Sequence, residues 1–237
     1  MCARFVLKKQ KQDLEAFFDL RLSMDLVPRF NIAPTQQVLA LRETEAGRRG
    51  ALLTWGLVPR WAKDPKVGAM MVNARAETVG EKPAFRDAYR YRRCLIPADG
   101  FYEWEKIGKA KQPWFIYRAD GDTAAFAGLW EHWQDPNGTE IETCTIITTV
   151  ANEMMQRLHD RMPVVLEREQ WARWLSPRTE AGEVDAMLVP GAAGILACHT
   201  VAREVGDSRR DEARFVEKVD AAPEKARDEG GQMGLFG

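Results

Sequence analysis

The sequence predicts an α+β fold in which a few short helices accompany a curved, largely antiparallel β-sheet or open barrel. Two observations predict this class. Many short runs of apolar and β-branched residues are separated by turns that contain Gly, Pro, Asp or Asn. Helical periodicity is confined to brief segments, and strands and helices do not alternate as they do in βαβ proteins. With 237 residues, 45% hydrophobic and 29% charged, the chain can bury a substantial core.

The expected strands are short and spread along most of the chain. A short strand is expected at the N-terminus, and residues 25–34 are expected to form a loop. The remaining strands are predicted at residues 38–41, 52–58, 94–96, 101–104, 114–117, 125–130, 143–150 and 163–166.

The segments with helical character are residues 14–22, 152–158, 167–175 and 179–188. In the first, apolar residues recur at helical spacing. The second begins with Asn152, a favourable N-cap residue. In the third, Trp171 and Trp174 share one face before a Ser-Pro pair ends the helix.

The chain is expected to comprise one domain, residues 1–219, followed by a disordered polar and Gly-rich tail, residues 220–237. No apolar run approaches the roughly 20 residues that a membrane helix needs, and the N-terminus lacks a signal-peptide core. We therefore expect a cytoplasmic protein without a membrane partner.

Cysteine and charge usage restrict the possible chemistry. The four cysteines stand far apart, without a C-x-x-C pair, so no disulfide, metal site or organic cofactor is implied. The formal net charge is -1, so affinity for nucleic acid requires a local basic cluster. One such cluster contains Arg86, Arg90, Arg92 and Arg93, although on charge alone a solvated helix or strand face is the favoured interpretation.

Cys2 is chemically distinctive because removal of Met1 leaves a free α-amine beside its thiol. With an amine pKa of about 7.7–8 and a thiol pKa near 8.5, part of each population is nucleophilic at neutral pH. An aldehyde condenses with such an amine to a Schiff base, and the thiolate then closes a thiazolidine ring. On the position of Cys2 alone, the favoured interpretation is that it is a small residue without a chemical role.

Seven segments change that balance, and they occur in this order: MCARF, NIAPTQ, WGLVPRWAKD, NARAET, RRCLIPADGFYEW, PWFIYR and LHDRMPVVL. Together they resemble the SOS response-associated peptidase (SRAP) family, whose members bind single-stranded DNA and crosslink to abasic sites through an N-terminal cysteine. The resemblance covers about residues 1–219. It implies a location in the cytoplasm near the nucleoid.

The resemblance implies a catalytic set of Cys2, Asn73, Glu103 and His159. Cys2 is the nucleophile, and Asn73 positions the Cys2 amine or the deoxyribose. Glu103 and His159 transfer the protons that sugar opening and carbinolamine dehydration require. Strand alternation directs Glu103 away from its two aromatic neighbours and gives Glu105 the same face, which makes Glu105 its rival. His159 has a structural alternative as a loop histidine, and His132 and His199 match no motif and are interpreted as structural.

The resemblance also assigns the DNA contacts to Arg4, Pro34, Trp61, Arg75, Thr148 and Arg161. The three arginines are expected to bind phosphates, or alternatively to form ion pairs, with Glu77 as the candidate partner of Arg75. Pro34 and Trp61 form an apolar wedge against bases, unless Trp61 lies in the core as expected for Trp104, Trp130 and Trp174. Thr148 is expected to form a hydrogen bond with the sugar, or alternatively only to pack within the protein.

The C-terminal residues Gln232, Leu235 and Phe236 resemble the peptide with which bacterial repair proteins bind the replication sliding clamp. An arbitrary apolar terminus is the alternative.

The leading hypothesis is a monomeric, lyase-like protein that captures abasic sites in single-stranded DNA as a thiazolidine crosslink and removes its own Met1. A cysteine peptidase or amidase, and a non-catalytic module that binds single-stranded DNA, remain as alternatives.

Overall fold

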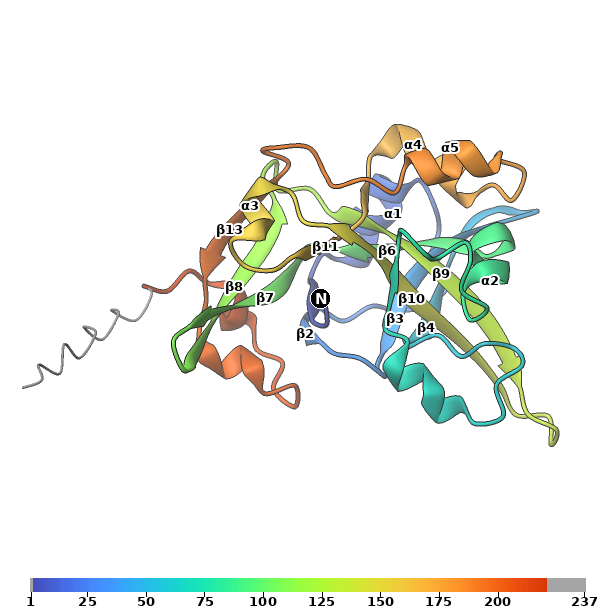
Figure 1. Ribbon diagram of the computed structural model, residues 1–237, viewed down its shortest axis with the longest axis horizontal. Helices are drawn as coiled ribbons and strands as arrows, with labels where there is room; N and C mark the ends of the chain where they lie inside the picture. The colour runs from blue at the N-terminus through green and yellow to red at the C-terminus, as the bar shows by residue number, and fades with distance from the viewer. Residues whose placement is uncertain (1, 221–237) are drawn as a thin grey trace, which may run out of the picture.

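The computed structural model describes residues 2–220 and arranges them around two β-sheets (Figure 1). The smaller sheet has the strand order β13-β8-β7-β1-β2. Its strands are β1 Phe5–Leu7, β2 Arg29–Ile32, β7 Gly100–Ile107, β8 Ala110–Arg118 and β13 Leu196–Thr200.

The larger sheet has the order β11-β10-β4-β3-β6-β9-β12, and β5 pairs with β10 outside this path. Its strands are β3 Gln37–Thr44, β4 Gly47–Trp55, β5 Asn73–Arg75, β6 Arg93–Ala98, β9 Ala124–Gln134, β10 Glu140–Val150, β11 Arg161–Pro163 and β12 Val165–Leu166. Because β9 also pairs with β10, the strands β10, β4, β3, β6 and β9 close into a barrel. The α+β class and the largely antiparallel sheet are therefore confirmed.

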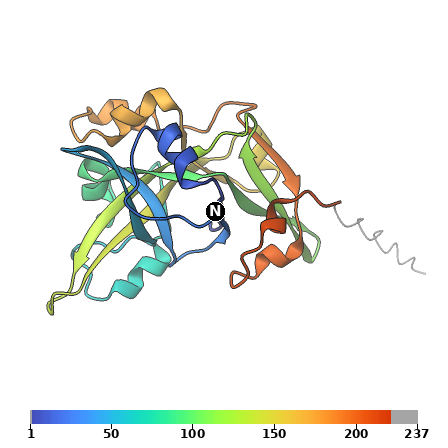
Figure 2. The same cartoon turned by 180° about the vertical axis from the view of Figure 1, so that it is seen from behind.

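Helices cover the barrel from outside. The α-helices are α1 Lys11–Phe18, α2 Arg86–Tyr91, α3 Glu153–Gln156, α4 Arg168–Leu175 and α5 Ala181–Ala186, and the 3-10 helices are η1 Pro65–Met70, η2 Arg203–Gly206 and η3 Ala213–Val216. The ring of Phe18 stacks on Trp171 with centroids 4.7 Å apart, which joins α1 to α4. Figure 2 shows these two helices on the same end of the barrel. Trp174 donates its indole N–H to the Cys94 carbonyl at 2.8 Å and so fixes α4 on β6.

Two hydrophobic cores meet at β7. Phe101 belongs to the barrel core, where its ring lies 5.9 Å from Phe126. Tyr102 faces the opposite side, in a second core with Phe215, under the 3-10 helices η2 and η3. This alternation places Glu103 on the same face as Phe101, as the sequence predicts.

Several expected elements are confirmed and others are wrong. Asn152 caps α3 by accepting a hydrogen bond from the Met155 N–H, and α4 and α5 lie within their expected ranges. The first helix covers 11–18 rather than 14–22, because Asp19 adopts a left-handed backbone with φ 51° that ends it. The expected loop at 25–34 contains β2, and β13 was not anticipated.

Candidate active site around Cys2

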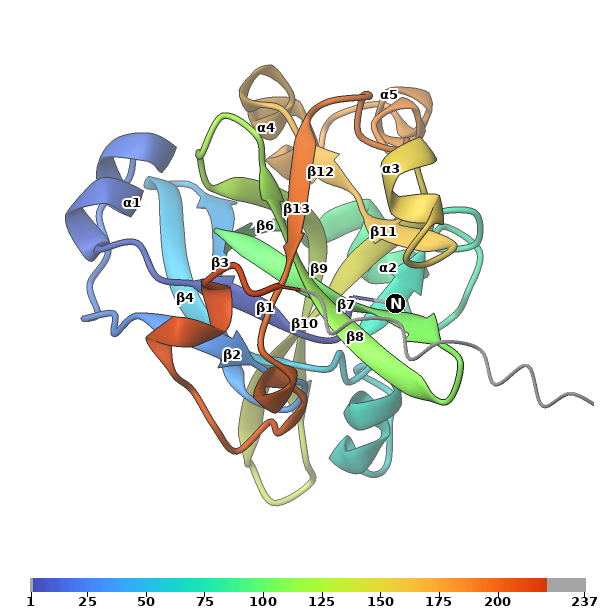
Figure 3. The same cartoon turned by 90° about the vertical axis from the view of Figure 1, so that its left-hand side faces the viewer.

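The pairing of β1 with β7 places Cys2 beside Glu103. Phe5 pairs with Phe101 in an antiparallel register, and the Tyr102 N–H donates to the Arg4 carbonyl at 2.9 Å. Continued by two residues, this register sets residue 3 opposite Glu103. Cys2 and Glu103 are both buried, with 0% and 4% of their surfaces exposed. Figure 3 shows β1 beside β7 at the centre of the molecule.

Asn73 approaches Cys2 from the larger sheet. It begins β5, which pairs in parallel with β10 at Ile146. Its Nδ2 donates to the Cys2 carbonyl oxygen at 2.8 Å. This contact fixes the orientation of the amide, since the reversed amide would set two oxygens against each other. The Asn73 Oδ1 is buried and finds no hydrogen-bond partner within residues 2–220, so an acceptor is available beside Cys2.

His159 lies between α3 and β11. Its backbone N–H donates to the Met155 carbonyl at 2.9 Å, so the capped helix sets the position of the ring. The ring Nδ1 faces the Arg161 N–H at 3.0 Å and an Asp160 carboxylate oxygen at 2.7 Å. An unprotonated Nδ1 accepts from the amide, and a protonated Nδ1 donates to the carboxylate. The ring is therefore held in both protonation states.

Burial controls the acid-base properties of the site. Burial raises the pKa of the Cys2 thiol well above its usual range, and the negative charge of Glu103 raises it further. The thiol is accordingly protonated at neutral pH. Burial likewise raises the pKa of the Glu103 carboxyl, although the nearby charge of His159 lowers it in part. Glu103 is thus a stronger base than an exposed carboxylate, and it interacts with both Cys2 and His159.

The predicted DNA-binding residues divide by exposure. Arg75 is exposed, Pro34 is half-buried, and Trp61 has 64% of its surface exposed. The alternative that Trp61 belongs to the core is therefore wrong. Of the other tryptophans expected in the core, Trp174 is fully buried, whereas Trp104 and Trp130 are only half-buried.

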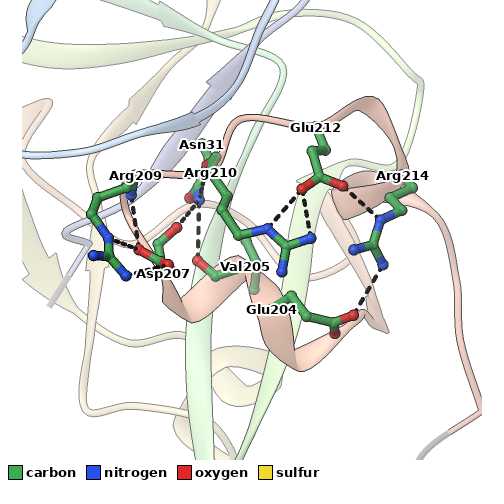
Figure 4. Close-up of polar contacts among 8 residues, drawn as sticks. All are labelled: Asn31, Glu204, Val205, Asp207, Arg209, Arg210, Glu212 and Arg214. Carbon is green, nitrogen blue, oxygen red and sulfur yellow. Dashed lines mark hydrogen bonds and ion pairs between the residues drawn. The ribbon is translucent and has the colours of Figure 1, made fainter.

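Arg4 is committed to a structural contact. Its Nη1 donates to Asn31 Oδ1 at 2.8 Å and to the Val205 carbonyl at 2.9 Å. Asn31 is buried, and its Nδ2 also donates to the carbonyls of Val205, Asp207 and Arg210 (Figure 4). Arg4 and Asn31 together hold the C-terminal 3-10 segment against β1 and β2.

Arg161 is also occupied. Its two terminal nitrogens donate to both carboxylate oxygens of Glu77, at 2.6 and 2.9 Å, and one of them donates to the Thr148 carbonyl at 2.6 Å. The alternative in which Arg75 pairs with Glu77 is therefore wrong, because Arg161 is the ion-pair partner of Glu77. Thr148 is fully buried, and its hydroxyl donates to the Ala74 carbonyl at 3.4 Å. These contacts support packing and bracing more than direct contact with a ligand.

The remaining candidates have other partners. Glu105 accepts a hydrogen bond from the Trp114 indole at 2.9 Å. His132 lies 3.3 Å from a Glu140 oxygen, and His199 contacts the Val216 carbonyl. The expected tail, with Gln232, Leu235 and Phe236, lies outside the described residues. Within the described part of the chain, no group of three or more His, Cys, Asp or Glu side chains could hold a metal ion, and no helix is long and apolar enough to cross a membrane.

The fold and the site define a class of protein: an α+β barrel in which a cysteine near the N-terminus lies among an amide, a carboxylate and an imidazole. The family model of the SOS response associated peptidase (SRAP) matches residues 1–208, and the chain belongs to this family.

The similar proteins include abasic site processing proteins from bacteria and vertebrates. The chain is 40% identical to YoqW of Bacillus subtilis over 92% of its own length and 99% of the relative. It is 30% identical to YedK of Escherichia coli over 92% of its length and 100% of the relative. It is 32% identical to HMCES of Xenopus tropicalis, over 68% of its length and 55% of that protein.

Solved structures show the same fold. A protein from Bacteroides thetaiotaomicron superposes with a TM-score of 0.86 at 24% identity, covering 92% of this chain and all (100%) of that one. A protein from Bordetella bronchiseptica superposes with a TM-score of 0.75 at 25% identity, covering 85% and 100%.

Proposed function

We propose that the protein, once Met1 is removed, captures abasic sites in single-stranded DNA as a covalent thiazolidine on Cys2. The observation that carries the proposal is the convergence on Cys2 of the Asn73 amide, at 2.8 Å, and of the interacting carboxylate and imidazole of Glu103 and His159. Its relatives are named abasic site processing proteins, which supports an abasic site as the target.

The reaction consumes one aldehyde and releases one water. The unprotonated Cys2 amine adds to C1′ of the ring-opened deoxyribose and forms a carbinolamine. Proton transfer to its hydroxyl expels water and leaves an iminium ion. The Cys2 sulfur then forms a bond to the same carbon as the thiol proton passes to a base, and the nitrogen retains the electron pair of the C=N bond.

The geometry suits Glu103 for the last proton transfer. The thiol is protonated in its buried position, so ring closure needs an adjacent acceptor. Glu103 interacts with Cys2, and its raised pKa makes it a suitable acceptor. His159, oriented by the Arg161 N–H or by Asp160, supplies protons to the departing hydroxyl.

Asn73 is proposed to orient the Cys2 amine. Its Nδ2 fixes the Cys2 carbonyl, and its buried Oδ1 is positioned to accept a hydrogen bond from an amine on the same residue. An amine that donates to Oδ1 directs its lone pair in a defined direction, which favours attack on the aldehyde.

We propose that the single-stranded DNA lies across the exposed residues near this site. Arg75 is available to bind a phosphate, and Trp61 and Pro34 offer apolar surface for stacking on bases. Arg4, Thr148 and Arg161 contribute to DNA binding mainly by shaping the site, since each already has protein partners.

We further propose that the same groups remove Met1 by hydrolysis of the bond between Met1 and Cys2, which consumes one water. We also propose that the protein acts as a monomer at replicating DNA and that its tail, whose sequence resembles a clamp-binding peptide, binds the sliding clamp. Mass spectrometry of Cys2→Ala and Glu103→Gln proteins tests self-processing, because both should retain Met1 when made without an aminopeptidase.

A denaturing gel tests the crosslink. Processed protein is mixed with a single-stranded oligonucleotide that carries one abasic site. We expect a shifted band that needs the abasic site and is absent with Cys2→Ala. Once Met1 is removed, Cys2→Ser and Cys2→Ala both retain the α-amine and lack the thiol, so each should form only a Schiff base that borohydride traps. Cys198→Ala, at a half-buried cysteine far along the sequence, is the matched control and should crosslink normally.

Three outcomes would contradict the proposal. A stable crosslink with Cys2→Ala, formed without borohydride, would remove the Cys2 thiol from the mechanism. Trapping of Cys2 by a peptide-like acylating agent, with no reaction toward the aldehyde, would favour a peptidase or amidase. Undiminished protection of abasic DNA by Cys2→Ala would favour a module that only binds single strands.

A further inference from the structure

A concave surface lies between α2 and the α4–α5 connection, with a volume of about 590 Å³. We call it the α2 pocket. Its charged lining consists of Arg86, Arg90, Arg93, Arg178, Glu180 and Asp185. Four guanidinium groups thus face two carboxylates in a protein whose formal net charge is -1.

Arg93 gives the pocket a buried positive charge. Only 5% of its surface is exposed. Its guanidinium donates to the carbonyls of Trp174, Tyr89, Arg90 and Ser176, which end the helices α4 and α2. Within residues 2–220 no carboxylate lies within ion-pair distance of it. These carbonyls lie at helix C-termini, whose dipoles stabilise a cation, and Arg93 thus carries its positive charge at the base of the pocket without a carboxylate partner among the described residues.

The cations at the rim are similarly uncompensated. Arg90 lies over the Tyr91 ring, 5.1 Å from its centroid, and Arg178 is exposed; neither forms an ion pair among the described residues. Arg86 has a single 3.3 Å contact with its chain neighbour Asp87, and both side chains are more than half exposed. Of the two acidic groups, Asp185 accepts a hydrogen bond from the Tyr89 hydroxyl at 2.5 Å and therefore already has a partner in the protein.

The C-terminal 3-10 segment provides the contrast (Figure 4). There, Arg209 pairs with Asp207 at 2.9 Å, and Arg210 pairs with Glu212 at 2.6 Å. Arg214 bridges Glu212 and Glu204. Each arginine in that cluster has a carboxylate partner, so the cluster offers little net charge to an external anion. The α2 pocket lacks this compensation.

The α2 pocket is adjacent to the candidate active site along the chain. Its lining includes Gly80, which lies within the series of tight turns that begins at Arg75: the Thr78 N–H donates to the Arg75 carbonyl at 3.1 Å, and the Lys82 N–H donates to the Thr78 carbonyl at 3.0 Å. Arg75 itself follows Asn73 on β5.

We propose that the α2 pocket binds the phosphodiester backbone of the DNA strand that flanks the abasic nucleotide, with Arg90 and Arg178 as phosphate ligands and Arg93 as the buried charge beneath them. The proposal rests on the proposed capture of abasic DNA and extends its footprint from Arg75 toward α2. An exposed guanidinium suits phosphate because its planar donors match the phosphate oxygens.

Salt dependence of binding tests the proposal. The protein is the full chain with Arg90→Gln and Arg178→Gln, and the ligand is a single strand with a reduced abasic analogue that lacks the aldehyde. Each lost contact should lower the slope of log affinity against log salt by about 0.7. Loss of two contacts therefore makes the fall in affinity between 50 and 200 mM salt smaller by about sevenfold. The matched control is Arg209→Gln with Arg214→Gln, which should leave the slope unchanged.

Oligonucleotide length provides a second measurement. A short strand that ends one nucleotide beyond the abasic site should bind the double variant and the wild type equally, whereas a long strand should distinguish them. An unchanged slope on the long strand, in variants that unfold at the wild-type temperature, would overturn the proposal. So would an equal loss in the control variant.

The two proposals fail separately. If the wild type forms no crosslink but the double variant still has a lower salt slope, covalent capture is refuted and the α2 pocket remains a site for the DNA backbone. If the wild type crosslinks and the double variant has an unchanged salt slope, covalent capture stands and the proposal for the α2 pocket is refuted.

Discussion

Replacement of Glu77 by alanine tests whether Arg161 acts as a brace. The strands β5 and β11 lie on opposite edges of β10: β5 pairs with residues Ile146 to Thr148, β11 pairs with Thr148 to Val150, and Thr148 pairs with both. The ion pair between Glu77 and Arg161 joins these two strands. Since Asn73 begins β5 and His159 precedes β11, we expect the ion pair to set the separation of these two proposed catalytic groups.

The magnitude follows from burial. Only 9% of the Arg161 side chain is exposed, against 47% for Glu77. Hydrogen bonds to a charged group contribute about 1.5–3 kcal/mol, and water compensates in part for the exposed partner, so Glu77→Ala should cost about 1.5–2 kcal/mol. For a domain of this size the unfolding temperature should fall by about 3–8 °C.

The pH dependence has a defined sign. The hydrogen bonds from Arg161 lower the pKa of Glu77 below the ordinary value of 4.5. The stabilisation is therefore present above the unfolded-state pKa and is lost as the pH falls through the lower folded-state pKa. Glu77→Ala should consequently differ most from the wild type at neutral pH and converge with it in acid.

Thermal unfolding and salt-dependent DNA binding are measured together. Arg161→Lys keeps the charge but loses the two-pronged contact, so it should lower the unfolding temperature and slow crosslinking. The control is Arg75→Gln, which should lower the salt slope by about 0.7 and leave stability unchanged. The reasoning is refuted if Arg161→Lys or Glu77→Ala alters DNA affinity without altering the unfolding temperature.

Four further predictions follow from individual contacts. Glu103→Gln should slow crosslinking yet raise stability at neutral pH. Burial raises the folded-state pKa of Glu103, so the wild type loses stability as the pH rises above the ordinary carboxyl pKa of 4.5. A difference in unfolding temperature that does not depend on pH would contradict this. Asn31→Ala removes hydrogen bonds to the C-terminal segment and should cost about 2–4 kcal/mol, with faster hydrogen exchange in residues 203–216; unchanged exchange there would disprove the anchoring role. Gly68→Ala places a methyl group 2.5 Å from the Gly56 carbonyl oxygen and should cost about 1–3 kcal/mol in chemical denaturation, whereas an unaffected variant would mean that the loop relaxes freely. Trp61→Ala should leave stability within about 0.5 kcal/mol and weaken single-strand binding by about 1–3 kcal/mol, and equal affinity would exclude stacking.

The fold was predictable from sequence where local chemistry decides the structure. Asn152 and the Trp-rich segment of α4 specify their helices through capping and periodicity. The first helix was placed too late because Asp19 ends it in a left-handed conformation that periodicity does not reveal. The strand β2 escaped prediction because Asn31 interrupts its apolar pattern, and its burial depends on carbonyls that lie more than 170 residues away.

In the candidate site, too, local motifs were predictable from sequence and contacts between distant residues were not. The motifs indicated Cys2, Asn73, Glu103 and His159, and the structure brings these residues together. Sequence could not reveal that Arg161 pairs with Glu77, because 84 residues separate them and the contact depends on β10, which places β5 and β11 on its two edges. For the same reason, proximity in sequence made Arg75 a misleading partner for Glu77.

For the proposed crosslinking reaction, the buried thiol predicts an order of steps and a role for Glu103 in both formation and reversal. A thiol whose pKa is raised by burial and by an adjacent carboxylate is a poor initial nucleophile, so the amine is expected to attack first. The same environment makes the thiolate a poor leaving group when the ring opens, so reversal needs a proton on sulfur. Glu103, having accepted that proton during closure, is positioned to return it. Glu103→Gln should therefore slow both formation and loss of the crosslink, whereas a variant that slowed formation alone would assign the return of the proton to His159.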